Sequence, residues 1–496
     1  MNITQFTTNL LPFSLGAALL TPSSCADASP KETSKGEGKK PLNVLFFVSD
    51  DMRPNLGCYG DKYAVTPNID RLAATGVVFN NAYCQQAVSN PSRASLLTGL
   101  RPDETGVINL ETHFRTKLPD LVTLPQLFMN NGYLALGTGK VFHALKETID
   151  PVSWSEPVPN YEVGGYLLPE NQGGGGKKNS TEEADVNDTA YVDGKMTLDA
   201  IKFMARAKNE SKPFFVAVGY KKPHAPYVAP KKYWDIYKDK PYEITDRERP
   251  AGAPALAFHN NEEIRGYRDV PDEGPIPHEK EQEIVHGYYA CISYIDAQVG
   301  KVLAALDSLG LKDNTIIVFW GDHGYHLGEQ EIWCKSTNFE LSAKAPLIIS
   351  APGMNGNGSS SSAIVEFVDV YPTLAELAGL TPQGKLSGTS LSPLLSDPDR
   401  KWKNIAFNQF TRPYRAIRKF PPTHMGYSVR TEDWRCTYWW DLKTGEVVEK
   451  ELYNLKDNKI EKENLAGNPR YAKVEKKLAQ MVTDYRNGNY NSTEKN

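Results

Sequence analysis

Two short clusters of acids could bind a metal ion in this sequence. Asp50-Asp51 and Asp322-His323 together offer three carboxylates and one imidazole. Carboxylate oxygens suit a hard cation such as calcium, whereas an imidazole nitrogen favours zinc or iron. The residue types therefore predict a metal site and leave the metal open. Taken alone, Asp50-Asp51 is also explained as a strand end that faces solvent.

Three further clusters supply a hydroxyl and several cations. Ser89–Arg93 (SNPSR) is typical of a capped helix start, and a helix N-terminus with an arginine one turn inside also binds anions. Gly139–His143 (GKVFH) places a cation and a titratable ring three residues apart, His224 lies between two prolines, and Lys335 follows Asp322 by thirteen residues. A single histidine on such a loop is more often structural. If the cations converge on a metal, they would suit a doubly charged, tetrahedral ester.

Most of these clusters follow predicted strands. Continuous apolar runs predict buried strands at Asn43–Ser49, Leu134–Gly137, Phe214–Tyr220, Thr315–Trp320 and Pro346–Ser350. Helices are predicted at Pro67–Gly76, Pro91–Gly99, Tyr191–Ala207, Glu281–Leu309 and Val368–Leu380. Strands that alternate with helices indicate an α/β fold with a mostly parallel sheet sandwiched by helices. Ligands bind outside the carboxyl ends of such strands.

The pattern changes after about residue 400. Short alternating segments at Tyr427–Arg430 and Arg435–Leu442 precede a charged helical stretch over Pro469–Tyr485. This order predicts a smaller C-terminal antiparallel sheet with a closing helix. We therefore divide the chain into a catalytic domain over 43–400 and an α+β subdomain over 401–496.

The start of the chain predicts export. Leu10–Leu20 is an apolar run of signal-peptide length, although no Lys or Arg precedes it. Residues 1–25 are interpreted as a signal peptide, either plain or of the lipoprotein type with a lipid anchor at Cys25, and residues 26–42 as a flexible linker. Six scattered cysteines fit neither a disulfide framework nor a zinc site, and a single disulfide stays open. The net charge of −4 argues against a nucleic-acid partner.

The combination resembles the type I sulfatases of the alkaline-phosphatase-like superfamily, and within them the iduronate-2-sulfatase branch. The segments that carry the resemblance are Asn43–Asp51, Gln86–Gly99, Gly137–His143, Lys222–Tyr227, Gly321–Glu340, Met425–Trp440 and Glu451–Ala466. They extend over about residues 43–470. Ser89–Gly99 is the most specific of them, because it resembles the recognition sequence of the enzymes that make formylglycine.

The resemblance implies a formylglycine-dependent mechanism. Ser89 would be oxidised by a maturase and hydrated to a gem-diol, of which one hydroxyl attacks the sulfur of a sulfate ester while the sugar alcohol leaves. Loss of a proton from the other hydroxyl would then expel sulfate. The family's metal is calcium, and its ligands here would be Asp50, Asp51, the modified Ser89, Asp322 and His323.

The resemblance also implies a role for each cationic or titratable side chain. Arg93 would hold the gem-diol near the metal, and Lys140 would orient it. His143 would be the base that collapses the sulfated intermediate. Lys335 and His224 would bind the sulfate oxygens, and one of them would protonate the leaving oxygen. Fixed cations that face developing negative charge would be the main electrostatic contribution.

The serine at position 89 departs from the best-known animal members of this branch, which have cysteine there. Serine-type sites are matured by a bacterial radical enzyme, so the resemblance implies an exported bacterial protein that is periplasmic, anchored to the outer membrane or secreted. A cysteine replaced by serine in an engineered, inactive protein is the alternative. Two other functions stay open: a phosphatase or phosphonate hydrolase on the same fold, and a sulfated-glycan binder with unconverted Ser89.

The implied substrate is a sulfated oligo- or polysaccharide. The branch favours a 2-O-sulfated uronate of a glycosaminoglycan, and algal polysaccharides such as ulvan or carrageenan are also implied. Segments 144–190 and 238–280 would shape the pocket, and 173–185 and 238–280 are predicted to be loops without helical or strand period. Candidate substrate contacts, each also explained by a structural role, are Lys222, Tyr227, Trp333 and Glu340.

Overall fold

The computed structural model describes residues 40–490 except 160, 162–164, 173–175 and 419. The predicted signal peptide, Cys25 and most of the predicted linker lie outside the described residues. Within the described ranges, no helix is long and apolar enough to cross a membrane. The five cysteines in this part of the chain carry free thiols.

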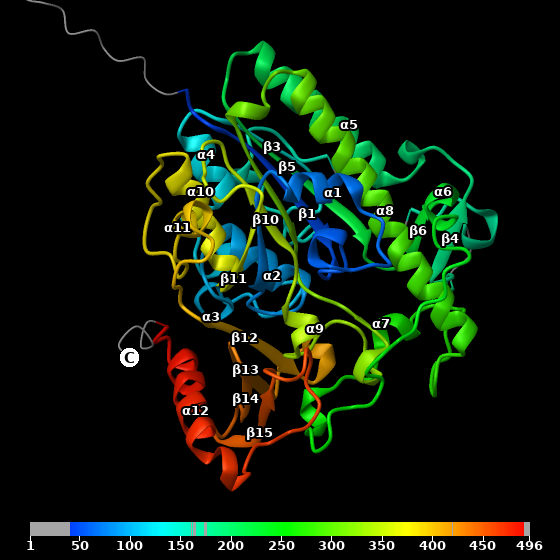
Figure 1. The fold of residues 1–496 in the computed structure, drawn as a ribbon, viewed down its shortest axis with the longest axis vertical. Coiled ribbons are helices and arrows are strands. Elements are labelled where there is room, and N and C mark those ends of the chain that lie inside the picture. The colour runs from blue at the N-terminus through cyan, green and yellow to red at the C-terminus, as the bar shows by residue number, and fades with distance from the viewer. Residues whose placement is uncertain (1–39, 160, 162–164, 173–175, 419, 491–496) are drawn as a thin grey trace, which may run out of the picture. The chain divides into compact units, whose positions relative to one another are not determined.

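A seven-stranded sheet forms the centre of the fold, in the order β11-β2-β10-β7-β1-β5-β3 (Figure 1). Its strands are β1 (Asn43–Asp50), β2 (Val77–Tyr83), β3 (Leu134–Gly139), β5 (Phe214–Pro223), β7 (Thr315–Gly321), β10 (Leu347–Ser350) and β11 (Ser359–Glu366). Strand β1 pairs in parallel with β5 and β7, whereas β10 runs antiparallel to β7 and β2. The mostly parallel sheet predicted from the sequence is confirmed, with β10 as its reversed strand.

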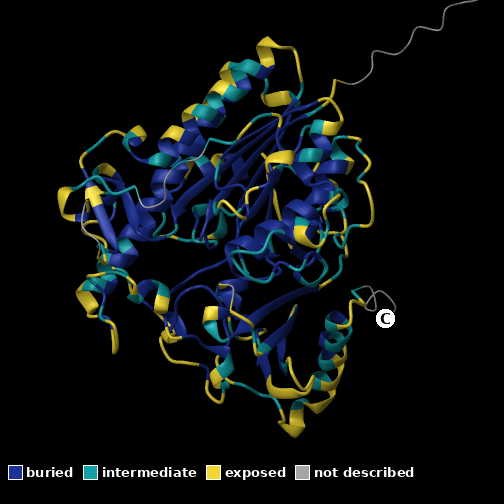
Figure 2. Cartoon of the chain, turned by 180° about the vertical axis from the view of Figure 1, so that it is seen from behind, coloured by how far each residue is buried: buried dark blue, intermediate teal, exposed yellow. Residues whose placement is uncertain are grey.

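Helices cover both faces of this sheet because the side chains of a strand alternate between two cores. Leu45 and Phe47 of β1 belong to one hydrophobic cluster, and Val44 and Phe46 belong to the other. The first cluster includes residues of α1 (Pro67–Ala73), α5 (Val192–Asn209) and α8 (His278–Ser308). The second includes residues of α2 (Ser89–Thr98), α4 (Leu124–Asn130), α10 (Val370–Leu377) and α11 (Ser392–Ser396). Figure 2 shows the buried strands between helices with exposed outer faces.

The C-terminal part of the chain adds a second sheet, as predicted. It is an antiparallel meander of β12 (Ile405–Arg412), β13 (His424–Thr431), β14 (Trp434–Asp441) and β15 (Val447–Asn454). Helix α12 (Ala472–Arg486) closes it, and Leu478 and Val482 of this helix share a hydrophobic cluster with Val429 and Cys436 of the sheet.

The prediction that segments 173–185 and 238–280 lack regular structure is wrong in part. Strand β4 (Thr181–Ala184) lies in the first segment and helix α7 (Glu262–Arg265) in the second. Other short elements of the fold are α3 (Pro102–Thr105), β6 (Tyr227–Pro230), α6 (Lys231–Trp234), β8 (His326–Leu327), β9 (Trp333–Cys334) and α9 (Glu340–Ala343). Strand β4 escaped detection because its sequence is polar. Buried Glu182 in it accepts hydrogen bonds from the backbone of Leu167 and Leu168, so its charge is satisfied inside. Helix α7 is too short to show a period.

Candidate active site

The carboxyl ends of parallel strands bring the predicted site residues together. Asp50 ends β1, Lys140 follows β3, His224 follows β5 and Asp322 follows β7. This edge of an open α/β sheet is where ligands bind. Ser89 is the first residue of α2, which begins two residues before the predicted start at Pro91.

Asp50, Asp51, Asp322 and His323 form a buried group, here called the acid cluster. One ligand atom from each lies within 4.8 Å of the others. Asp51 has a φ of 62°, a left-handed conformation that is costly for a residue with a side chain and is concentrated at functional sites. Its backbone N–H donates to Asp322 Oδ1 at 3.0 Å. Its own Oδ1 is buried, without a hydrogen-bond partner among the described residues.

The acid cluster fits a divalent cation. A carbonyl oxygen only accepts, so His323 Nδ1, 2.9 Å from the Gly324 carbonyl, carries a hydrogen, and Nε2 is the ring nitrogen that faces Asp51 Oδ1, 3.4 Å away. His323 Nε2 and Asp51 Oδ1 are atoms that could bind a metal. Three carboxylates and one imidazole suit a metal with mainly oxygen ligands and do not identify it.

Ser89 faces the acid cluster from the start of α2. Its Oγ donates to Asp50 Oδ1 at 2.9 Å and lies 3.4 Å from His323 Nε2. Arg93, fully buried in the next turn, pairs with Asp322 Oδ2 at 2.9 Å and with Asp50 Oδ1 at 3.1 Å. Its Nη1 donates to the Lys140 carbonyl. Arg93 therefore fixes the carboxylates and ties α2 to the ends of β1, β3 and β7.

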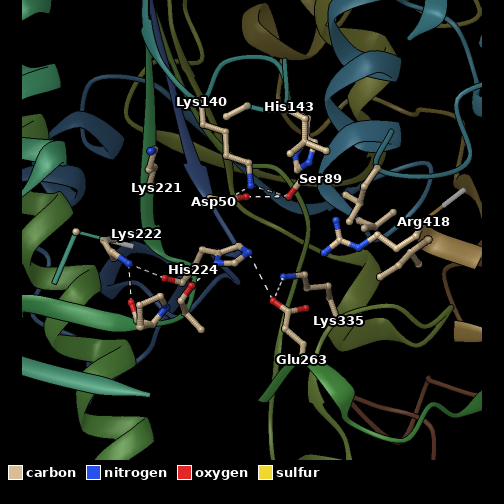
Figure 3. Close-up of a pocket in the computed structure, with 18 of the residues that line it drawn as sticks. Asp50, Ser89, Lys140, His143, Lys221, Lys222, His224, Glu263, Lys335 and Arg418 are labelled. Atoms are coloured by element: carbon tan, nitrogen blue, oxygen red, sulfur yellow. Dashed lines mark hydrogen bonds and ion pairs between the residues drawn. The ribbon is translucent and has the colours of Figure 1, made fainter. Parts of the chain in front are cut away.

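Lys140 and His143 approach Ser89 from the segment after β3 (Figure 3). Lys140 Nζ pairs with Asp50 Oδ2 and lies 3.4 Å from Ser89 Oγ. Burial would raise the pKa of Asp50, but Lys140 and Arg93 outweigh it and hold that pKa well below its usual range. Burial and the Lys140 charge lower the pKa of His143 well below its usual range, so its imidazole is neutral at pH 7.

Lys335 reaches the other side of the acid cluster. It lies between Cys334 and Ser336, which have φ values of 72° and 80°. Its Nζ donates to Asp51 Oδ2 at 2.8 Å and to Glu263 Oε1 at 2.5 Å. Burial would lower the pKa of Lys335, but these two carboxylates raise it well above its usual range, so the ammonium stays charged.

His224 lies beside the same lysine. Its Nδ1 is 2.5 Å from the Ala225 carbonyl, and its Nε2 is 3.5 Å from Glu263 Oε1. Burial, followed by the charge of Lys335, lowers the pKa of His224 to about 3. Sequence reasoning missed Glu263, because the Glu-Glu pair at 262–263 in a predicted loop looks like an ordinary solvated surface.

The acid cluster opens into a cavity of about 570 Å³. Ser89, Lys140, His143, His224 and Lys335 all line it, so the structure brings these predicted residues into one pocket. Figure 3 shows their side chains around a common centre. Arg93 is not among its lining residues, because its guanidinium lies behind Asp50 and Asp322.

The four candidate substrate contacts are explained mainly by structural roles. Lys222 lines the cavity, but its Nζ donates to the carbonyls of His224 and Pro226 at 2.9 and 2.5 Å. The lining residues do not include Tyr227, Trp333 or Glu340, all of which are buried. For these three, the structural interpretation replaces that of a substrate contact.

Similarity to known proteins decides the family. The family model described as Sulfatase matches residues 42–380, and the model for the C-terminal region of N-sulphoglucosamine sulphohydrolase matches residues 328–488. The chain belongs to the sulfatase family. Iduronate 2-sulfatase of Homo sapiens is 35% identical to this sulfatase over 489 residues, which cover 84% of this chain and 88% of that protein. The chain is thus a sulfuric ester hydrolase of an iduronate-2-sulfatase-like branch.

Solved structures share the fold of this sulfatase. One, described as a complex with its substrate D-glucosamine-2-N,6-O-disulfate, has a TM-score of 0.73 at 24% identity, and covers 92% of this chain and 100% of that one. A phosphonate monoester hydrolase from Silicibacter pomeroyi has a TM-score of 0.72 at 21% identity, with 92% and 97% covered. At these identities the likeness concerns the fold alone, and it extends to enzymes that cleave a different ester.

Proposed function

We propose that this sulfatase hydrolyses sulfate esters of a sulfated carbohydrate, with residue 89 converted to formylglycine and calcium held by the acid cluster. The observation that carries the proposal is the position of Ser89 Oγ, 2.9 Å from Asp50 Oδ1 at the floor of a cavity with Lys140, His143, His224 and Lys335 around it. A nucleophile beside fixed cations suits an anionic ester.

The acid cluster also has the charge that this role requires. Its three aspartates and Glu263 carry four negative charges, against three positive charges on Arg93, Lys140 and Lys335, a net of −1. A divalent cation would make the site +1, and the single negative charge of a sulfate monoester would then bring it to zero. The metal would therefore strengthen the attraction between these groups and the ester.

Four side chains would hold calcium together with residue 89, namely Asp50, Asp51, Asp322 and His323. When bound, calcium would stabilise negative charge on the ester oxygens. Formylglycine would supply, as its hydrate, a hydroxyl nucleophile that no unmodified side chain offers.

The remaining site residues would orient groups and move protons. Lys140 Nζ, 3.4 Å from Ser89 Oγ, would orient the side chain at position 89 while Arg93 keeps Asp50 and Asp322 in place. His143, neutral at pH 7, would accept a proton from a hydroxyl at that position.

Lys335 and His224 would bind the sulfate oxygens and serve the leaving group. Burial holds the pKa of His224 at about 3, with the charge of Lys335 as the second cause, whereas Lys335 keeps its proton. The leaving sugar oxygen would take a proton from Lys335, or from His224 once a bound sulfate offsets the Lys335 charge.

The substrate class we propose is a sulfated glycosaminoglycan, with a 2-O-sulfated uronate favoured over the algal polysaccharides ulvan and carrageenan. The 35% identity with iduronate 2-sulfatase over 84% of this chain supports this choice. The match of residues 328–488 to the C-terminal model of an N-sulphoglucosamine enzyme supports the same class.

The proposal keeps the catalytic domain at 43–400 and the C-terminal subdomain at 401–496.

Maturation and export complete the proposal. A serine at position 89 would be converted by a bacterial serine-type maturase, as a transient partner, before the chain is exported. The final location, periplasmic, lipid-anchored through Cys25 or secreted, follows from how residues 1–25 are processed.

The experiment that tests the proposal measures sulfate release by protein produced with a serine-type maturase. Its substrates are heparin and dermatan disaccharides, ulvan and carrageenan oligomers, and a phosphonate monoester. We expect sulfate from 2-O-sulfated uronates and none with Ser89→Ala. Hydrolysis of the phosphonate alone would show a phosphonate hydrolase. Binding without hydrolysis, in protein that carries the aldehyde, would show a glycan binder.

A further inference from the structure

The turn after β12 reaches from the C-terminal sheet into the cavity. Arg412, the last residue of β12, donates to the carbonyls of Leu256 at 2.8 Å, Ala257 at 3.0 Å and Ser336 at 3.1 Å. The carbonyl of Ile417 accepts a hydrogen bond from the Leu110 backbone at 2.7 Å. Because Ser336 follows Lys335 directly, these bonds fix the turn against the catalytic segment.

Arg418 is the next residue of this anchored turn, and it lines the cavity. Figure 3 shows its side chain pointing toward the space between Ser89 and Lys335. The side chain is exposed, and the described residues offer it neither an ion pair nor a side-chain hydrogen bond. The neighbouring Ile417 is buried, with 6% exposure, so the backbone that carries Arg418 is held in place.

The other cations of the cavity are already engaged. Lys140 pairs with Asp50, and Lys335 pairs with Asp51 and Glu263. Lys221 and Lys222 donate to backbone carbonyls. The guanidinium of Arg415 lies over the Phe420 ring at 5.2 Å. Among the described residues, the side chains of Arg415 and Arg418 have neither an ion pair nor a hydrogen bond, and Arg418 differs from Arg415 in having no ring contact either.

The positive charge of Arg418 is not needed to balance the charges around Ser89. A divalent cation and one sulfate monoester bring the acid cluster, Glu263 and their three cations to zero without Arg418. A planar guanidinium matches the two oxygens of a carboxylate or a sulfate. We infer that Arg418 binds a second anionic group, a carboxylate or a further sulfate, on the saccharide whose sulfate ester lies at Ser89. The inference rests on the proposed function and makes Arg418 a specificity-determining residue.

The test uses two pairs of substrates that differ in the second charge. One pair is methyl 2-O-sulfo-α-L-iduronide and its carboxyl-reduced counterpart. The other is glucosamine N,6-disulfate and N-acetylglucosamine 6-sulfate. We expect the enzyme to prefer the doubly anionic member of one pair by about tenfold in kcat/KM, as one bidentate charged contact provides. The pair that shows the preference identifies the group as carboxylate or sulfate.

Variants at position 418 decide the assignment. Arg418→Gln is expected to bring the ratio of the two kcat/KM values close to one. Arg418→Lys should keep part of the preference, because lysine keeps the charge but lacks the planar pair of donors of a guanidinium. Arg400→Gln, at an exposed arginine that does not line the cavity, is the matched control and should leave the ratio unchanged. An unchanged ratio in Arg418→Gln, or an equal loss in Arg400→Gln, would overturn the inference.

A binding measurement separates this inference from the proposed function. Calorimetry of the same four saccharides with Ser89→Ala, with and without Arg418→Gln, gives the affinity ratio without turnover. We expect the doubly anionic saccharide to bind about tenfold more tightly only when Arg418 is present. If the aldehyde-bearing protein releases no sulfate, the proposed function fails, and the binding ratio still decides the role of Arg418. Equal affinities with Arg418 present would contradict it.

Discussion

Two buried groups of charged residues in this protein differ in how their charges are balanced. The acid cluster lies at the carboxyl edge of the central sheet and opens into the cavity. The other group, here called the junction cluster, consists of Glu340, Arg430, Arg435, Glu451 and Glu461 and links α9 with the C-terminal sheet. Around the acid cluster the acids outnumber the cations by four to three, whereas the three acids of the junction cluster face three arginines once Arg412, which interacts with Glu451, is included.

The junction cluster pairs its acids with arginines of the chain, although Glu461 Oε2 is also buried without a hydrogen-bond partner among the described residues. Glu340 pairs with Arg435 at 2.7 Å and with Arg430 at 2.9 Å, and Arg435 pairs with Glu461 at 2.8 Å. Burial raises the pKa of Glu451 to about 7, although Tyr453 and Trp439 donate hydrogen bonds to it. Arg412, which interacts with Glu451, and a proton on Glu451 can therefore both offset the negative charge of this group.

The acid cluster has no such internal solution. Lys140 and Arg93 hold the pKa of Asp50 low, Asp51 Oδ1 has no hydrogen-bond partner among the described residues, and His323 Nε2 faces the carboxylates. A bound cation would balance this arrangement. The comparison teaches that a buried charge group that opens into a cavity indicates binding, whereas one that is paired within the protein away from the cavity indicates stability.

Of the changes that test this comparison, removal of divalent metal should have the largest effect on activity. Dialysis against a chelator is expected to lower sulfate release by at least about 100-fold, because the carboxylates of the acid cluster would then face the ester without the metal that offsets their charge. The melting temperature should fall by several degrees and recover with calcium, since the metal binds the folded state. Undiminished activity and melting temperature after metal removal would break the distinction between the two groups.

Glu340→Gln should affect stability and leave the catalytic residues alone. The change leaves Arg430 and Arg435 buried with a weakened partner, which we expect to cost about 3 kcal/mol in the free energy of unfolding. Urea unfolding measures the loss, and the activity of the folded fraction should match that of the parent. Glu449→Gln, an exposed position on β15, is the control. A variant with normal stability and reduced activity would place Glu340 with the functional group instead.

Glu451 should make stability depend on pH. Its pKa is raised from 4.5 to about 7 in the folded protein, so the unfolded chain ionises first and stability falls as pH rises from about 4.5 to above 7. This pKa difference corresponds to at most about 3 kcal/mol. Glu451→Gln should remove the contribution and gain stability relative to the parent at pH 8 but not at pH 4. Identical dependence of stability on pH in parent and variant would contradict a raised pKa of Glu451 in the folded protein.

The sequence predicted the parts of the molecule that depend on local pattern. Buried strands such as β1 and β7 are long apolar runs, and the polar residues that follow them necessarily meet at one edge of a parallel sheet. For this reason Asp50 and Asp322 were placed in one site without a structure. The resemblance to sulfatase motifs implied that Ser89 and Lys140 lie beside them.

Long-range pairing set the limit of prediction. Glu263 comes from the four-residue helix α7 and Arg418 from a turn, and neither sequence shows a period. Only tertiary hydrogen bonds, such as that of Arg412 to the Ser336 carbonyl, bring such residues to the pocket. The sequence also leaves the roles of Tyr227 and Glu340 open. A buried side chain with a hydrogen bond or an ion pair and a side chain that contacts substrate look alike in one sequence.

The most direct test of the account is the chemical state of residue 89. Protein produced with and without a serine-type maturase is digested, and the mass of the peptide that contains residue 89 is compared with its rate of sulfate release. We predict a peptide lighter by two hydrogen atoms, and sulfate release proportional to the converted fraction. Equal sulfate release by protein in which Ser89 is wholly unconverted would contradict the account.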